Sequence, residues 1–253
     1  MPLSYLILMI LLFFATSVVG VVTGSNSLVT VPVMFQFGID EKVAIATNMF
    51  GLTFMAIGGT IPFVRKGSIE FRKLTPLVVL TIAGSALGAL LVGSITNQSI
   101  KVIVSVAMIV MIIFTLARHN GSRTADDGTR SARSPAYAIT YVLTFFLAIY
   151  GGLYSGGYVT VLTATLVTFA AMSFTESVAA TKFINVFSSG IATLIFMWQG
   201  LVDYKLGIFF GVSMFVGAFV GAHYATKMNE LWLKRIFLTT VMILAVKTLV
   251  DFF

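Results

Sequence analysis

Two short stretches rich in glycine and hydroxyl residues interrupt the apolar sequence, and they are the residues best suited to bind a ligand. The first, residues 20–32, reads GVVTGSNSLVTVP, and the second, residues 151–161, reads GGLYSGGYVTV. A helix that restarts inside a membrane presents unpaired N–H groups and the positive end of its dipole, and both favour an anion. The two stretches therefore predict two helix starts that meet around one small anion.

Polar residues in the apolar segments that follow each stretch extend this predicted site. Thr47 and Asn48 follow the first stretch, and Thr181, Lys182 and Asn185 follow the second. Their hydroxyl, amide and ammonium groups can donate hydrogen bonds to a bound anion. Lys182 is the most informative of them, because an ionisable group inside a membrane span is costly and usually has a function. Because Asn48 and Lys182 occupy equivalent places, the predicted site is asymmetric.

Each candidate also has a purely structural interpretation. The hydroxyl and amide side chains of the breaks can cap the helices that restart there. Lys182 can extend toward the membrane surface, Asn185 can bond a neighbouring helix, and the ring of Tyr158 can pack without touching a ligand. The candidate substrate-binding residues, with no catalytic residue and no metal ligand among them, are Gly24, Ser25, Asn26, Ser27, Thr47, Asn48, Ser155, Gly156, Gly157, Tyr158, Thr181, Lys182 and Asn185.

The composition places the chain in a membrane and argues against several classes of site. Hydrophobic residues make up 58% of the chain and charged residues 10%, and the mean hydropathy is +1.02. A soluble domain carries about a quarter charged residues. The chain has no cysteine and only two histidines, which argues against a metal centre. Neither a nucleophile–base arrangement nor a Walker loop occurs, so we expect neither an enzyme nor a primary pump, and no cofactor.

The apolar segments predict an all-α polytopic membrane protein built from two homologous repeats. The first repeat, residues 1–117, and the second, residues 136–253, flank a polar cytoplasmic linker at 118–135. Each repeat begins with a region that a glycine-rich break divides, and three apolar spans follow it. We expect the broken regions at 3–37 and 136–169, and the spans at 43–63, 74–95, 102–117, 178–198, 204–226 and 231–250.

Equivalent positions of the two repeats share residue types that chance similarity between apolar helices does not explain. An Ala-Thr-Asn triplet aligns with Ala-Thr-Lys, one glycine pair with another, and one lysine with another. Glycines four residues apart also allow two helices in lipid to pack closely. The aligned sets, at an offset near 133 residues, are 46–48 with 180–182, Gly84 and Gly88 with Gly217 and Gly221, and Lys101 with Lys234.

Basic residues between the spans indicate that the second repeat is inverted relative to the first. The formal charge is +7, and the basic residues cluster in short connections, where they set membrane orientation rather than bind nucleic acid. The connection at 65–73 is basic and its counterpart is not, whereas the next pair of connections reverses this bias. Equivalent connections on opposite sides require a re-entrant or split hairpin followed by three crossings in each repeat. A parallel arrangement of four plus four spans stays an alternative.

The order of these motifs resembles the TauE/SafE family, the sulfite exporters and their relatives in the toluenesulfonate uptake permease superfamily. The resemblance rests on the glycine- and serine-rich break that ends in VTVP, on the Ala-Thr-Asn/Lys element, and on their recurrence after the linker. It implies a secondary transporter in a prokaryotic inner membrane, an exporter or importer of sulfite, sulfonates or related organosulfur anions by alternating access. A proton or a sodium ion would be the coupling ion. The sequence GSNS, where many relatives carry a richer glycine run, leaves the substrate open.

Two other functions stay open at this point. One is a passive anion channel, and the other is a membrane sensor or scaffold in which the linker is the working part. As partners we expect a small anionic substrate and the lipid bilayer, and no nucleic acid. The direction of transport, and whether the chain forms a homo-oligomer, stay open.

Overall fold

The computed structural model of the chain describes residues 3–24, 26–119, 135–229, 231–233, 235 and 239. These residues are largely helical and include no strand, which confirms the predicted all-α fold class. Most of the predicted linker and nearly all of the last predicted span lie outside them. The helices are α1 (Leu3–Thr23), α2 (Ser27–Gln36), α3 (Glu41–Arg65), α4 (Phe71–Ser94), α5 (Asn97–His119), α6 (Pro135–Leu153), α7 (Tyr158–Phe169), α8 (Phe174–Trp198) and α9 (Tyr204–Ala225).

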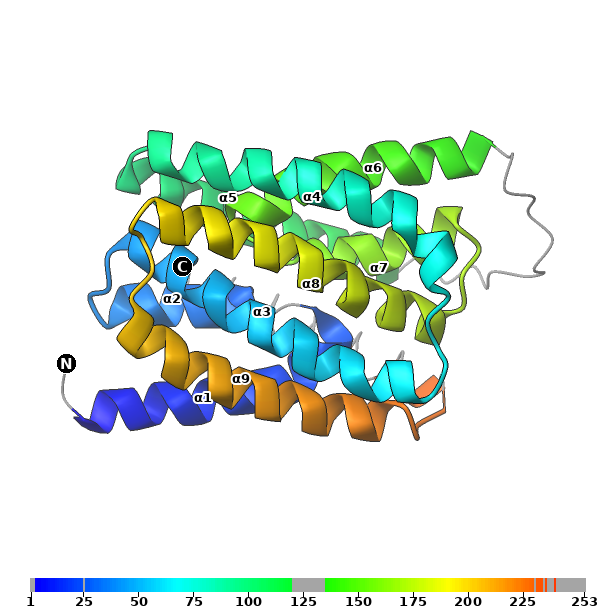
Figure 1. The fold of residues 1–253 in the computed structure, drawn as a ribbon, viewed down its shortest axis with the longest axis horizontal. Coiled ribbons are helices and arrows are strands. Elements are labelled where there is room, and N and C mark those ends of the chain that lie inside the picture. Colours follow the sequence, from blue (N-terminus) through cyan, green and yellow to red (C-terminus); the bar gives the residue numbers. More distant parts are fainter. Residues whose placement is uncertain are drawn as a thin grey trace.

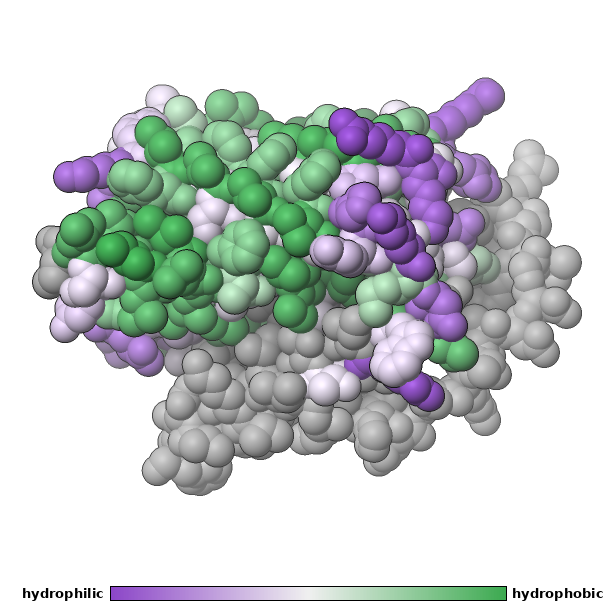
Figure 2. All heavy atoms as spheres, turned by 90° about the horizontal axis from the view of Figure 1, so that it is seen from below, coloured by the Kyte–Doolittle hydropathy of each residue, from purple (hydrophilic) through white to green (hydrophobic). Residues whose placement is uncertain are grey.

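Within the described part of the chain, five helices are long and apolar enough to cross a membrane, namely α1, α3, α4, α8 and α9. Large hydrophobic side chains such as Val79, Leu194 and Val212 are exposed on their outer surfaces. Figure 2 shows hydrophobic residues over most of the described part of one face, with hydrophilic residues gathered toward the two ends and more of them on the right. Such a surface suits contact with lipid chains, and the chain is a multi-pass membrane protein.

Two helical hairpins enter the bundle from opposite ends (Figure 1). The hairpin of α1 and α2 has its outer ends on the left, where α2 connects to α3. The hairpin of α6 and α7 has its outer ends on the right, where α3 connects to α4 and α7 connects to α8. α3, α4, α8 and α9 run along the bundle between them. These directions agree with the inverted arrangement, and the duplication itself stays a prediction.

Polar side chains fix the residues at which the long helices begin. The Asp40 carboxylate accepts hydrogen bonds from two backbone N–H groups in the first turn of α3, at 3.0 and 3.2 Å. Ser173 and Glu176 form a capping box at the start of α8, and the Asp203 carboxylate caps α9. Each such cap stabilises a helix by about 1 kcal/mol. The caps therefore fix the residue at which each of these helices begins, and with it the position of the helix along the bundle.

Glycines allow each hairpin to pack against a helix from the other half of the chain. A Cβ atom at Gly88 of α4 would lie 2.0 Å from the carbonyl oxygen of Ile149 in α6, and Gly84 is similarly close to α6. A Cβ atom at Gly221 of α9 would lie 2.1 Å from the carbonyl oxygen of Val18 in α1. The two halves are thus interlocked through α4 against α6 and α9 against α1. The close packing predicted from the glycine pairs is present at both places.

α3 and α8 pack against each other in the centre of the bundle. The hydroxyl groups of Thr53 in α3 and Thr193 in α8 form a hydrogen bond of 3.0 Å between the two helices. Ser188 of α8 forms a hydrogen bond of 2.7 Å with Ser85 of α4. Buried hydroxyl groups must be paired, so these contacts fix how the helices are rotated about their axes. That rotation decides which side chains of α3 and α8 face the hairpins.

Candidate functional site

Both breaks use backbone conformations that ordinary residues rarely adopt. Gly24, directly after α1, has a φ of +72°, and Gly157, directly before α7, has a φ of +80°. Ser155 also has a positive φ, of +68°. A Cβ atom at Gly24 would lie 2.6 Å from Cβ of Val159, so this glycine is required both for its φ and for its closeness to α7. The sequence thus forces both helices to stop at the predicted places.

The two breaks lie in direct contact with each other. The Thr160 hydroxyl of α7 donates a hydrogen bond of 2.7 Å to the carbonyl oxygen of Thr23, the last residue of α1. The Tyr154 hydroxyl donates a hydrogen bond of 3.1 Å to the carbonyl oxygen of Ser27, the first residue of α2. The Thr23 carbonyl group, which the end of α1 leaves without a partner in that helix, is therefore satisfied by the opposite hairpin. The two stretches meet inside the bundle, as the sequence predicts.

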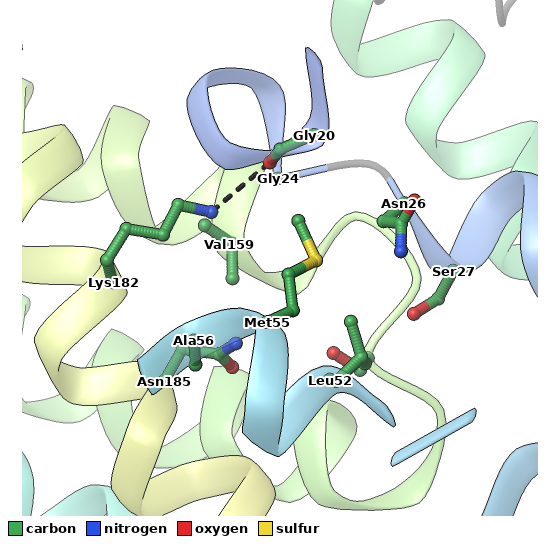
Figure 3. Close-up of a pocket in the computed structure, with 11 residues that line it drawn as sticks. Gly20, Gly24, Asn26, Ser27, Leu52, Met55, Ala56, Val159, Lys182 and Asn185 are labelled. Carbon is green, nitrogen blue, oxygen red and sulfur yellow. Dashed lines mark hydrogen bonds between the residues drawn. The ribbon is translucent and has the colours of Figure 1, made fainter. Parts of the chain in front are cut away.

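A small pocket lies where the breaks meet α3 and α8 (Figure 3). Its volume is about 10 Å³, which is on the order of one water molecule. An anion of several atoms therefore needs the pocket to widen before it can enter. The lining residues are Gly20, Gly24, Asn26, Ser27, Leu52, Met55, Ala56, Ser155, Val159, Lys182 and Asn185.

Lys182 places the only ammonium group among these lining residues, and its side chain is 2% exposed. Its Nζ atom donates a hydrogen bond of 3.2 Å to the carbonyl oxygen of Gly20 in the last turn of α1 (Figure 3). Its stem passes beside Gly59 of α3. The ammonium group thus stays inside the bundle, so the interpretation in which Lys182 extends to the membrane surface is wrong.

Two asparagine side chains face the same space from different helices. Asn26 and Asn185 both line the pocket, and the Oδ1 atom of each is buried without a hydrogen-bond partner. The amide nitrogen of Asn26 donates a long hydrogen bond of 3.5 Å to the Ser17 hydroxyl. A half-turn of either amide would present N–H donors in place of the oxygen. Buried polar atoms without partners are uncommon, and here they are available to a ligand.

Neither restarting helix is capped by the side chain of its N-cap residue. Asn26 is the N-cap of α2 and makes no capping hydrogen bond, and Gly157, the N-cap of α7, has no side chain to make one. The Ser155 hydroxyl belongs to the pocket lining. The capping role predicted for Asn26 and Ser155 is therefore wrong, and Ser25 lies outside the described residues. Helix starts without side-chain caps keep N–H groups that an anion can use.

Asn48 and Thr47, on α3, hold neighbouring elements in place and do not line the pocket. The Asn48 oxygen accepts a hydrogen bond of 2.6 Å from Thr30, and its nitrogen donates one of 2.9 Å to the Ser27 hydroxyl. The Thr47 hydroxyl accepts a hydrogen bond of 3.0 Å from the backbone N–H of Asp203, directly before α9. Asn48 therefore orients the start of α2, which does face the pocket.

The remaining predicted residues support the second break. The Thr181 hydroxyl bonds Thr163 of α7, and the Gly156 carbonyl accepts a hydrogen bond from the Tyr150 hydroxyl. The ring of Tyr158 packs on Gly151. The predicted residues that lie outside the pocket lining are Thr47, Asn48, Gly156, Gly157, Tyr158 and Thr181.

Five of the residues that line the pocket were not predicted from the sequence as site residues. Leu52, Met55 and Ala56 of α3 form an apolar wall, together with Val159 of α7. The three α3 residues lie four, seven and eight positions after Asn48, which is the spacing of one helix face. That periodicity could have found them. Gly20 contributes a backbone carbonyl group, for which residue type is a weak signal.

The sequence model of the family described as "Sulfite exporter TauE/SafE" matches residues 8–248 of the chain. The chain belongs to the TauE/SafE family. The match covers the second hairpin, all but the first five residues of the first, and all the residues that line the pocket. The pocket therefore lies within the part that defines the family.

Curated relatives of this TauE/SafE protein are similar over nearly its whole length. It is 26% identical over 247 residues to "Probable membrane transporter protein ORF9" from Sinorhizobium sp., covering 96% of this chain and 93% of the relative. It is 23% identical to "Probable membrane transporter protein" from Haemophilus influenzae, covering 85% and 81% of the two chains. It is 22% identical to "Probable membrane transporter protein YfcA" from Escherichia coli, covering 95% and 89%. The protein is thus a multi-pass member of a membrane transporter family.

Proposed function

We propose that this protein is a secondary transporter of a small sulfur-containing anion, such as sulfite or an alkylsulfonate, which binds in the pocket between the two breaks. The observation that carries the proposal is the position of Lys182, buried opposite two helix starts that have no side-chain cap. An ammonium group and converging helix dipoles both stabilise negative charge. The family description names sulfite export, which supports a sulfur anion as the ligand.

The polar groups around the pocket suit an oxyanion in particular. The amides of Asn26 and Asn185 and the hydroxyl groups of Ser27 and Ser155 surround the space that Lys182 faces. An anion with several oxygen atoms can accept from these donors at the same time. The apolar wall on α3 would lie beside the rest of the ligand. The anion would replace the Gly20 carbonyl oxygen as the partner of Lys182.

Alternating access fits the arrangement better than a passive channel does. The hairpins come from opposite ends and meet at the pocket, so a movement of one hairpin would open the pocket to one side (Figure 1). The pocket is also too small in this conformation for an anion to pass through. Concentrative uptake by reconstituted protein under an imposed ion gradient would support the carrier, and purely equilibrating flux would support the channel.

A binding screen with the purified protein tests the proposed ligand class. We expect sulfite, thiosulfate, methanesulfonate, sulfoacetate or taurine to raise the thermal unfolding temperature more than acetate does. Lys182→Met should weaken binding about tenfold to a hundredfold, because a charge-assisted hydrogen bond is lost. Lys205→Met, at an exposed lysine, is the matched control and should bind normally. Equal binding by all three proteins would remove Lys182 from the site.

A further inference from the structure

The side-chain nitrogen of Lys182 is enclosed without an opposite charge. Its protein hydrogen-bond partner is the carbonyl oxygen of Gly20, which also accepts the helix hydrogen bond from the Gly24 N–H at 2.8 Å. The ion pairs found among the described residues join Lys73 to Glu70 and Lys101 to Glu41, both at helix ends. No carboxylate in the described part of the chain lies within ion-pair distance of Lys182.

The helices packed around Lys182 bring no compensating charge to it. The described parts of α1 and α2 contain no Asp, Glu, Lys, Arg or His, and the charged residues of α3 are confined to its ends. α7 contains no Asp, Glu, Lys, Arg or His either, and the buried hydroxyl group of its Tyr158 has no hydrogen-bond partner among the described residues. On α8 itself the Glu176 carboxylate bonds the Ser173 backbone, and His223 of α9 is exposed.

The site stabilises the neutral amine form of Lys182 better than the charged ammonium form. A neutral amine needs only a hydrogen-bond acceptor, and the Gly20 carbonyl supplies one. A positive charge in a closed site, even one lined by neutral polar groups, is unfavourable unless an opposite charge accompanies it. A bound anion would supply that charge, next to the same nitrogen atom. Anion binding and protonation of Lys182 should therefore favour each other, as any two linked equilibria must do reciprocally.

From this geometry we propose that Lys182 takes up one proton together with each anion, so that the transporter moves an anion and a proton in the same direction. The inference rests on the proposed function and adds the identity of the coupling ion. The proton comes from water on the side where the anion enters, is held on Nζ of Lys182, and leaves to water on the other side with the anion. For a monovalent anion the loaded step carries no net charge.

This coupling has a quantitative signature. A gradient of one pH unit across the membrane should accumulate a monovalent anion about tenfold on the alkaline side. A membrane potential of about 100 mV should leave that accumulation unchanged, whereas it would redistribute an uncoupled monovalent anion about fiftyfold. The two driving forces therefore separate cotransport from uniport.

The experiment uses the full-length protein in proteoliposomes, with radiolabelled methanesulfonate and sulfite as probes and a pH-sensitive dye in the lumen. Methanesulfonate carries no titratable proton at neutral pH, so any acidification of the lumen reports protons that the protein moves. We expect one proton per methanesulfonate, with uptake that follows the pH gradient. Uptake without acidification, driven by the membrane potential, would overturn the coupling and leave the proposed function standing. No uptake of either probe would overturn both.

A variant whose side chain is always charged tests whether Lys182 is the residue that carries the proton. Because an arginine stays charged, Lys182→Arg should bind or move the anion without the proton. In the pH range in which binding takes up one proton, the affinity of the wild-type protein for methanesulfonate should fall tenfold for each unit by which the pH rises. The affinity of Lys182→Arg should not depend on pH in this way. Lys205→Arg at the surface should keep the wild-type slope. A folded Lys182→Arg protein that still moves one proton per anion overturns the assignment.

Discussion

Replacing Asn185 should affect anion binding but not the stability of the fold, because its buried Oδ1 atom has no hydrogen-bond partner among the described residues. We expect Asn185→Leu, which has a similar volume, to lower anion affinity about tenfold. Unfolding should hardly change, since no hydrogen bond within the protein is lost. Calorimetric titration of the anion and thermal unfolding of the same samples measure the two effects. A large loss of stability with normal affinity would show that Asn185 only joins helices.

Replacing Asn48, in contrast, should lower the stability of the fold. Its amide bonds both Thr30 and Ser27, so Asn48→Leu removes two buried hydrogen bonds, and the Thr30 hydroxyl keeps only its bond to the Asn26 carbonyl oxygen. We expect the free energy of unfolding to fall by about 2–4 kcal/mol. Unfolding in mixed micelles with increasing denaturing detergent measures it, with Asn185→Leu as the volume-matched comparison. Unchanged stability would mean that the start of α2 is held by other contacts.

The sequence could predict which segments carry the site better than which residues face it. Adjacent residues on a helix point about 100° apart, so Thr181 and Lys182 cannot both face one small pocket. Which of them does depends on the rotation of α8, and contacts distant in sequence, such as Ser85 with Ser188, fix that rotation. Asn48 and Lys182 aligned in the sequence, yet Asn48 bonds a neighbouring helix and Lys182 lines the pocket.

At the scale of the elements, the first break depends on Gly24 for two separable reasons. Gly24→Ala would place a side chain at a positive φ and also 2.6 Å from Val159. Gly38 also has a positive φ, of +75°, but has no neighbour within 4 Å of an added Cβ. We expect Gly38→Ala to destabilise the protein by about 1 kcal/mol and Gly24→Ala by several times more. Denaturant unfolding measures both, and equal effects would contradict the predicted contact with α7.

The interlock between α4 and α6 can be tested in the same way. An alanine at Gly88 would bring Cβ to 2.0 Å from a backbone oxygen, whereas one at Gly190 of α8 has open space around it. Gly88→Ala should lower the unfolding temperature and the yield of folded protein. Gly190→Ala should be neutral or stabilising by about 0.5–1 kcal/mol, because alanine favours a helix. A well-folded Gly88→Ala protein would show that the two helices can move apart.

The breaks and the close helix contacts were predictable because glycine has few other reasons to occur in an apolar helix. Gly24 and Gly157 end helices, and Gly88 and Gly221 admit a neighbouring backbone. The partner of each glycine was not predictable, because periodicity within one helix carries no information about which distant helix covers it. The contact of α9 with α1 joins the last and first described long helices.

At the scale of the whole molecule, the distribution of charge predicts how the protein lies in the membrane. The α3–α4 connection and the helix ends beside it carry Arg65, Lys66, Arg72 and Lys73. The Lys66 ammonium bonds the carbonyl of Thr226 after α9. Both therefore lie at the same end of the bundle, and basic ends face the cytoplasm. The connection from α8 to α9 lies at the other end (Figure 1).

Single cysteines can test this orientation without removing any native thiol, because the chain contains no cysteine. In intact cells a membrane-impermeant maleimide should label Lys205→Cys, because Lys205 lies in the first turn of α9, at the end of the bundle that faces outward. Lys73→Cys should react only after the cells are opened, because its connection faces the cytoplasm. Labelling of both from outside would contradict the orientation, and labelling of unfolded protein controls for reactivity.

The interlocked hairpins have a consequence for how the protein is made. The Ser213 hydroxyl of α9 donates a hydrogen bond to the carbonyl oxygen of Ile10 in α1, across 203 residues of sequence. A ribosome synthesises about 5–20 residues each second, so α1 is inserted many seconds before its covering helix exists. During that time the polar break around Asn26 also lacks α7 and α8. The first hairpin must therefore wait in a provisional position, and the membrane insertion machinery is the natural place to hold it until synthesis is nearly complete.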